Sequence, residues 1–128
     1  MYHDELIAAA PSEALCIKCF QHPLLMQLAT DHALFMARTN RQGHQHWEQR
    51  HAIIKKNLNI HGTEVCAESW WWEKRPEEAA DSMWKSWFYH PTGHKEVCIA
   101  KHLCYGATMA KGRRVWYACI IVGDKTSA

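Results

Sequence analysis

Apolar residues return every three or four positions between His22 and about Asn40, which is the spacing of a buried helical stripe. The members of this stripe are Leu25, Leu28, Ala29, His32, Phe35 and Met36. Pro23 suits the first turn of such a helix, and the turn residues Arg41-Gln42-Gly43 follow its end. His32 lies inside the stripe, so we expect it to be a hydrogen-bonded core residue and not a ligand.

Two further segments have helical spacing. We expect His44–Asn57 to be helical, with Trp47, Ile53 and Ile54 as apolar anchors. A third helix is predicted from Pro76 to about Trp87, with Pro76 in its first turn and acidic residues beside it. Its apolar face consists of Ala80, Met83, Trp84 and Trp87, which makes Trp84 a predicted core residue.

Strand patterns occupy the middle and the end of the chain. Thr63–Trp70 is a predicted strand bounded by polar residues, and Tyr105–Ala110 with Val115–Val122 predicts an antiparallel hairpin joined by residues 111–114. Lys95–Ala100 is predicted to be a short helical turn. Helices first and strands last, with one strand between helices, indicate an α+β or a layered α/β/α domain.

Composition and charge restrict the classes of function. The 128 residues suit one domain, with 48% apolar and 22% charged residues. A net charge of +2 with dispersed basic residues does not predict a nucleic-acid-binding protein. No apolar run approaches the roughly 20 residues of a membrane span. The acidic start M-Y-H-D-E-L is unlike a secretory signal peptide, so we expect no secretion by that route.

Six cysteines leave the redox state open. An even number suits disulfides, whereas the missing signal peptide favours reduced thiols. Cys16-Ile17-Lys18-Cys19, followed by His22, is half of a zinc-site pattern that Cys66, Cys98 or Cys104 could complete in space. The interpretation that we favour is buried or locally paired thiols.

Glu68 and His94 are the first candidates for chemistry. They flank the predicted Pro76 helix, and a strand, a helix and a turn at Pro91–Gly93 can bring them together. A carboxylate facing an imidazole is either a proton-transfer pair or half of a metal site, and the spacing does not choose between the two.

Five motifs in this order resemble the CAP superfamily, which includes cysteine-rich secretory proteins, antigen 5 and pathogenesis-related (SCP-like) proteins. They are H-P-L-L-M-Q-L-A-T-D-H-A-L-F-M-A-R, G-H-Q-H-W, C-A-E-S-W, W-K-S-W with G-H, and Y-G-A-T-M-A with V-W-Y-A-C-I-I-V-G. The resemblance implies a three-layer α–β–α sandwich with a C-terminal antiparallel hairpin. It divides the chain into an N-terminal arm or short helices (1–21), a CAP-like domain (22–123) and a C-terminal tail (124–128).

The resemblance also implies a cleft built from His44, Glu68 and His94, with His46 as a rival to His44. Ser69 stands where the family's A-E-N motif has asparagine, and Trp87 stands where a second glutamate is expected. In the family the two histidines can hold a divalent metal, often zinc, so zinc on His44 and His94 is the cofactor to test. Of the two interpretations of these three polar residues, we favour a structural hydrogen-bonded cluster slightly over a working catalytic site.

Two functions follow as expectations. The first is a non-enzymatic binding or structural module, in which Trp70, Trp71 and Trp72 form an interaction surface for a protein partner or for self-association. Small stand-alone copies of this kind resemble those of tailed bacteriophages, which implies a tail- or capsid-associated virion component. The expected location is then the virion, after synthesis in the host cytoplasm, or else the cytoplasm itself. The alternative is a metal-assisted hydrolase acting on cell-wall, peptide or lipid substrates through Glu68 and the cleft histidines.

Overall fold

The computed structural model describes residues 20–89, 97 and 102–126, apart from the side chains of residues 84 and 87–89. The elements are β1 (Phe20–Gln21), α2 (Pro23–Thr39), α3 (Trp47–Leu58), β2 (Ile60–Glu68), α4 (Pro76–Tyr89), β3 (Cys104–Lys111) and β4 (Trp116–Lys125). The strands form one four-stranded sheet in the order β1-β3-β4-β2. The fold therefore belongs to the α+β class, as predicted.

The sheet is mixed, and β4 lies at its centre. β4 pairs antiparallel with both β2 and β3, whereas the short β1 runs parallel to β3. β3 and β4 form the predicted C-terminal hairpin. The sheet includes Phe20–Gln21 and continues to Lys125, so it extends two residues beyond each end of the predicted 22–123 domain.

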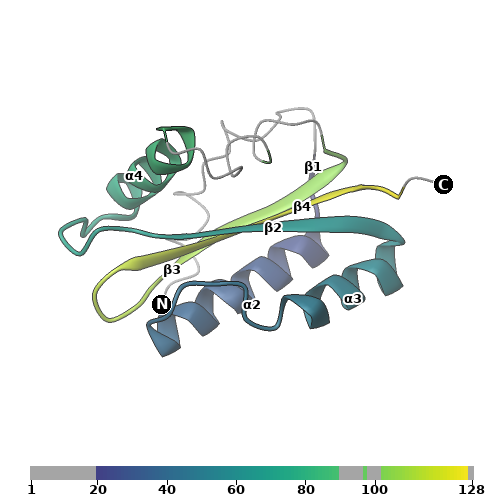
Figure 1. Ribbon diagram of the computed structural model, residues 1–128, viewed down its shortest axis with the longest axis horizontal. Helices are drawn as coiled ribbons and strands as arrows, with labels where there is room; N and C mark the ends of the chain where they lie inside the picture. Colours follow the sequence, from purple (N-terminus) through teal and green to yellow (C-terminus); the bar gives the residue numbers. More distant parts are fainter. Residues whose placement is uncertain (1–19, 90–96, 98–101, 127–128) are drawn as a thin grey trace.

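Helices α2 and α3 cover one face of this sheet (Figure 1). The His22 side chain caps α2 by accepting a hydrogen bond from the Leu24 N–H at 3.0 Å, and Asn40 ends the helix in the left-handed conformation (φ 53°). α2 lies very close to β3 at Gly106, where a Cβ atom would come 2.3 Å from the Leu25 carbonyl carbon. Only glycine allows this approach.

Helix α3 begins at Trp47, three residues after the predicted start. His46 precedes it with a φ of 63°, and the Trp47 N–H donates to the His44 carbonyl, so residues 44–46 form a turn instead of a helical end. That turn brings the His44 side chain to the sheet.

Helix α4 lies on the other side of the sheet from α2 and α3, near one end (Figure 1). Its residues Ala79, Ala80 and Met83 are buried and join the main apolar cluster together with α2, Ile54 of α3 and Trp116. The predictions for the Trp84 and Trp87 side chains, for His94 and for residues 95–100 other than Val97, which is helical, lie outside the described residues. Within the described part of the chain, no helix is long and apolar enough to cross a membrane.

Candidate functional site

A cluster of polar side chains lies between the sheet and the helices that cover it. β2 alternates its side chains between the two faces, and Glu64 and Cys66 both point to the face under α2 and α3. We call the group the Glu64 cluster, and its members are His32, His44, Arg50, Glu64, Cys66 and Cys119. Only His44 is substantially exposed, with 48% of its side chain accessible.

Arg50 of α3 holds the Glu64 carboxylate with two hydrogen bonds. Its Nε donates to Oε2 at 2.8 Å and its Nη2 donates to Oε1 at 2.7 Å. Nη1 donates to the Gln45 carbonyl at 2.7 Å, which ties the guanidinium to the turn before α3. Such a bidentate pair supplies the opposite charge that a buried carboxylate needs.

His44 and two thiols complete the surroundings of Glu64. Nδ1 of His44 lies 2.9 Å from Glu64 Oε1 and 3.7 Å from the Cys66 sulfur. The thiols of Cys66 and Cys119 lie 3.5 Å from Oε1 and 3.6 Å from Oε2 respectively. The carboxylate therefore has polar partners on both oxygens.

His32 closes the cluster from α2. It is 2% exposed, and its Nε2 lies 2.6 Å from the Gly43 carbonyl, which can only accept, so this nitrogen carries the proton. The prediction that His32 is a hydrogen-bonded core residue is confirmed.

The contacts shift the pKa values of His44 and Cys66 in opposite directions. The hydrogen bond with Cys66, and then the one with Glu64, outweigh the effect of burial and raise the pKa of His44 to about 9. The hydrogen bond from Cys119, helped by His32 and His44, outweighs burial and lowers the pKa of Cys66 to about 5. The two residues therefore form an imidazolium–thiolate pair at neutral pH.

The pKa values of the other two acids in the cluster, Glu64 and Cys119, are also shifted in opposite directions. Burial acts to raise the pKa of Glu64, but the hydrogen bonds from Arg50 and His44 are stronger together, and the pKa is lowered. Burial, followed by the neighbouring Cys66, raises the pKa of Cys119 well above its ordinary value, so Cys119 keeps its proton. The cluster thus holds two anions against two cations.

His32, Glu64 and Cys66 each offer one ligand atom within 4.8 Å of the others, as a metal site requires. Their contacts do not fit a cation, because Nε2 of His32 is engaged by Gly43 and both oxygens of Glu64 are bound to the Arg50 guanidinium. An ion between them would lie beside that positive charge. Zinc on His44 and His94 stays a prediction, since His94 lies outside the described residues.

The structure pairs His44, and not His46, with a carboxylate, but that carboxylate is Glu64. The His46 ring instead packs edge-on against the Phe35 ring, with the ring centres 5.3 Å apart. Glu68 is on the same face of β2 as Glu64, four residues further along, which is about 13 Å in an extended strand. The hydrogen-bonded carboxylate partner of His44 is therefore Glu64, and a cleft of His44, Glu68 and His94 stays a prediction because His94 lies outside the described residues.

Glu68 lies at the exposed end of β2 and lines two surface pockets. One, of about 380 Å³, is bounded by Asn40, Glu68, Arg113, Arg114, Val115 and Tyr117. No described histidine lines it. The other, of about 290 Å³, lies between Glu68, Trp70 and helix α4. Glu68 is therefore part of the surface around the tryptophan run.

Sequence reasoning missed Glu64 because its only signal is weak. Residues 64, 66 and 68 share one face of β2, so the alternation of side chains along the strand gave no reason to choose Glu64 over Glu68 as the site residue. The motif match then favoured Glu68. The additional clue in the sequence is Arg50, which lies three residues after Trp47 and four before Ile54 and so on their helical face, where an arginine needs an acidic partner.

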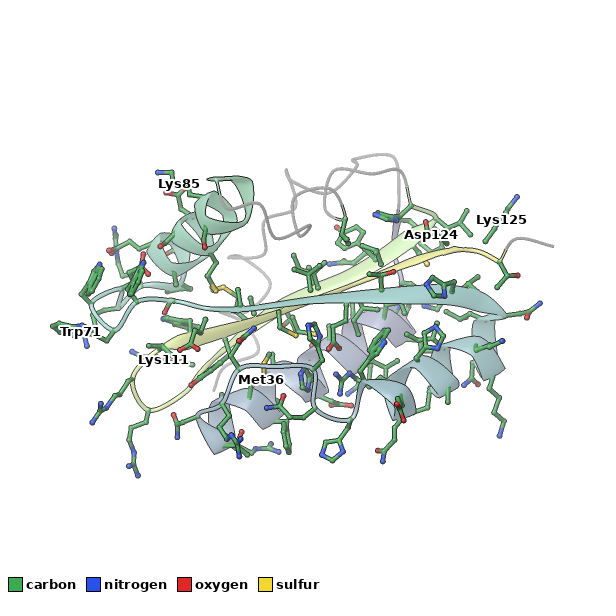
Figure 2. The ribbon with its side chains drawn as sticks, viewed as in Figure 1. Met36, Trp71, Lys85, Lys111, Asp124 and Lys125 are labelled. Atoms are coloured by element: carbon green, nitrogen blue, oxygen red, sulfur yellow. The ribbon has the colours of Figure 1, made fainter. Side chains whose placement is uncertain are left out.

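The tryptophan run forms a second candidate site, which we call the tryptophan knob (Trp70, Trp71 and Trp72). The three side chains are 59%, 62% and 54% exposed, so the prediction that at least one faces away from the core is confirmed for all three. Trp70 and Trp72 stack with ring centres 5.1 Å apart, and Trp71 meets Trp72 edge-on at 5.6 Å. Figure 2 shows Trp71 at one end of the molecule, with Asp124 and Lys125 at the other.

Hydrogen bonds fix the loop that carries the knob. The Ser69 N–H donates to the Trp116 carbonyl at 2.9 Å, and the Trp116 N–H donates to the Ser69 hydroxyl at 2.9 Å. The Glu73 carboxylate accepts from the Trp70 N–H at 2.7 Å, and the Trp116 indole donates to the Lys74 carbonyl at 3.3 Å. The knob is thus exposed but preorganised.

Comparison with known proteins adds no relative. No family model matches the chain, and neither curated proteins nor solved structures give a match. The CAP resemblance therefore stays a prediction, and the site must be interpreted from its own geometry.

Proposed function

We propose that this protein is a non-enzymatic binding module that docks a protein partner through the tryptophan knob. The observation that carries the proposal is that Trp70, Trp71 and Trp72 are each more than half exposed on a loop that hydrogen bonds hold in place. Exposing three indoles to water is costly unless a partner covers them. Fixing them in advance lowers the entropy lost on binding.

The shape of the knob favours a protein partner over a sugar. Trp70 and Trp72 cover one face of each other, with rings only 3° from parallel, and Trp71 stands at 82° to Trp72. The flat indole area that could stack on a sugar ring is therefore small, and the three side chains form a compact apolar projection instead. Projecting aromatic anchors that enter a pocket are the commonest energetic centre of protein interfaces.

The surroundings indicate the charge of the partner. Exposed Lys74 and Arg114 bound a pocket of about 360 Å³ next to Trp71, and Arg113 is exposed beside them on the β3–β4 turn. An apolar pocket with an acidic rim would complement both the knob and these cations. The three-layer CAP sandwich and the role as a bacteriophage virion component are part of this proposal, and they rest on the sequence resemblance alone.

The hydrolase alternative has less support. Glu64 has a lowered pKa and is bound to Arg50 through both oxygens, which makes it a poor general base. Glu68 is exposed, and the described residues place no histidine in its pockets. The contacts around both carboxylates suit structure and docking better than turnover.

The test compares docking with turnover in the same variants. Trp71→Ala should reduce incorporation of the protein into its native assembly, which for a virion means its amount in purified particles, by at least tenfold. Ile53→Ala is the matched control, because Ile53 is an exposed apolar residue (40%) on α3, away from the knob. Glu68→Gln and Glu64→Gln should leave incorporation unchanged wherever they fold.

Hydrolysis of generic ester and peptide substrates is measured in parallel. We expect no turnover above that of a heat-inactivated sample. Turnover that disappears with Glu68→Gln or Glu64→Gln, together with normal incorporation of Trp71→Ala, would replace the binding module by the hydrolase.

A further inference from the structure

Cys66 and Cys119 lie directly opposite each other on β2 and β4. The Ser69 N–H donates to the carbonyl of its partner Trp116 at 2.9 Å, so that pair is a hydrogen-bonded one. Pairs alternate along an antiparallel ladder, and counting back three pairs makes Cys66/Cys119 a non-hydrogen-bonded pair. Side chains approach most closely at such positions, with Cα atoms about 4.5 Å apart.

That separation allows a disulfide. Bridged cysteines have Cα atoms about 4.4–6.8 Å apart, so the pair lies at the short end of the range. Both residues point to the face covered by α2 and α3, and neither is in a disulfide in the structure. The register of the strands therefore places the two cysteines where a disulfide can form.

We propose that Cys66 and Cys119 form a peroxide-reactive dithiol, in which hydrogen peroxide oxidises Cys66 and Cys119 then closes a reversible disulfide. The contacts of the two sulfurs give them different roles. Cys66 lies beside the half-exposed His44, with its sulfur 3.7 Å from Nδ1, whereas Cys119 is 0% exposed. Cys66 is therefore the attacking sulfur and Cys119 the resolving one.

Access and reactivity agree with this order. Cys66 itself is only 2% exposed, so a bulky oxidant cannot reach it, but hydrogen peroxide is small and uncharged and can approach along the exposed His44 ring. The hydrogen bonds that lower the pKa of Cys66 supply the thiolate, which is the form that attacks peroxide. The pairing itself rests on the register of the strands.

The chemistry balances in two steps. The Cys66 thiolate attacks one oxygen of hydrogen peroxide, the O–O bond breaks, and the departing hydroxide takes a proton from the His44 imidazolium to leave as water. Cys66 is then a sulfenic acid, oxidised by two electrons. The Cys119 sulfur attacks the Cys66 sulfur, the S–O bond breaks, and the hydroxyl leaves as a second water with the Cys119 proton.

The disulfide would change the Glu64 cluster. The sulfurs of Cys66 and Cys119 lie 3.5 Å and 3.6 Å from the Glu64 carboxylate oxygens. A disulfide would remove the negative charge of the Cys66 thiolate and the proton of the Cys119 thiol from beside that carboxylate. A disulfide is reduced by thiol–disulfide exchange with an added thiol, which restores both cysteines. The oxidation should therefore be reversible.

The test is peptide mapping of the native full-length protein after hydrogen peroxide. Lysine and arginine place all six cysteines in different tryptic peptides, with Cys66 in residues 57–74 and Cys119 in residues 115–125. We expect one cross-linked pair of these two peptides, lost on treatment with dithiothreitol, while Cys104, also buried on this face, stays a thiol. Both cysteines remaining thiols, or cross-links that involve only other cysteines, would overturn the proposal.

Variants test the order of the two steps. In Cys119→Ala, peroxide should leave a sulfenic acid on Cys66 that dimedone labels at least tenfold more than any cysteine of Cys66→Ala. Cys104→Ala is the matched control and should form the Cys66–Cys119 disulfide as the wild type does. Labelling of Cys119 in Cys66→Ala would contradict the assigned roles, and the wild-type mapping decides the proposal even where a variant does not fold.

Discussion

At the scale of single residues, Glu64 is stabilised by its neighbours more than by solvent. Its side chain is 1% exposed, and Arg50 and His44 supply two positive charges against the carboxylate and the Cys66 thiolate. A buried carboxylate without such partners would be neutral or would destabilise the fold. The charge balance of four side chains therefore explains why a glutamate can occupy the inner face of β2.

The pKa shifts of His44 and Cys66 predict how stability depends on pH. The raised pKa of His44 contributes stability that is complete below 6.5 and is lost as the pH rises through about 9. The lowered pKa of Cys66 contributes stability that is complete above 9.0 and is lost as the pH falls through about 5. The two slopes cancel between 6.5 and 9, so the pair makes stability fall only as the pH is lowered from 6.5 to about 5.

Urea unfolding at several pH values checks this prediction. The urea concentration at the unfolding midpoint of the wild type should be constant between pH 6.5 and 9 and should fall as the pH is lowered from 6.5 to about 5. Cys66→Ala removes the thiolate and, with it, the largest cause of the raised pKa of His44, so the fall in the midpoint between pH 6.5 and about 5 should disappear. A midpoint of the wild type that is flat from pH 5 to 9 would contradict the assigned shifts.

At the scale of elements, the position of α2 on the sheet depends on Gly106. A Cβ there would come within 2.3–2.4 Å of backbone atoms of Leu25 and Met26, which cannot move like a side chain. The helix lies across β3 and β4 and carries His32 into the Glu64 cluster. The close contact at Gly106 therefore determines how near α2, and with it His32, comes to Glu64.

Gly106→Ala should destabilise the protein by about 3 kcal/mol or more, since overpacking against backbone forces the helix away from the sheet. Gly62→Ala is the matched control, because a Cβ there meets the flexible Ile54 side chain at 3.0 Å. Chemical denaturation measures both. Equal losses in the two variants would show that α2 adjusts freely and that the contact at Gly106 is unimportant.

At the scale of the whole molecule, the described tryptophans divide between core and surface. Trp116 is 1% exposed and is hydrogen-bonded to Ser69 and Lys74 on either side of the tryptophan knob, while Trp71 is 62% exposed. The core residue thus holds the loop that carries the exposed ones. Stability and docking are assigned to different tryptophans at the same end of the fold.

Trp116→Ala should lower the free energy of unfolding by about 3–5 kcal/mol, as large-to-small changes in a core do. Trp71→Ala should change it by no more than about 0.5 kcal/mol, because its ring lies mostly in solvent. Equilibrium unfolding in urea compares the two. A large loss in Trp71→Ala would mean that the knob packs on the core and is not a free docking surface.

The sequence by itself determined the local elements. The spacing of apolar residues and the residues at helix ends predicted α2 from Pro23, α4 from Pro76 and the hairpin of β3 and β4, because these elements depend on neighbours within a few residues. It also gave the buried His32 and the exposed tryptophans. The start of α3 was predicted three residues early, since the left-handed His46 leaves no mark in the apolar pattern.

Only the tertiary structure decided which distant residues meet. Glu64 and Glu68 are equivalent in the alternation of β2, and the turn before α3 placed His44 on Glu64. Likewise, the register of β2 against β4, and no local pattern, set Cys66 opposite Cys119. A period tells which face a side chain occupies, whereas its partner depends on how far one element slides along another, and packing of the whole fold fixes that distance.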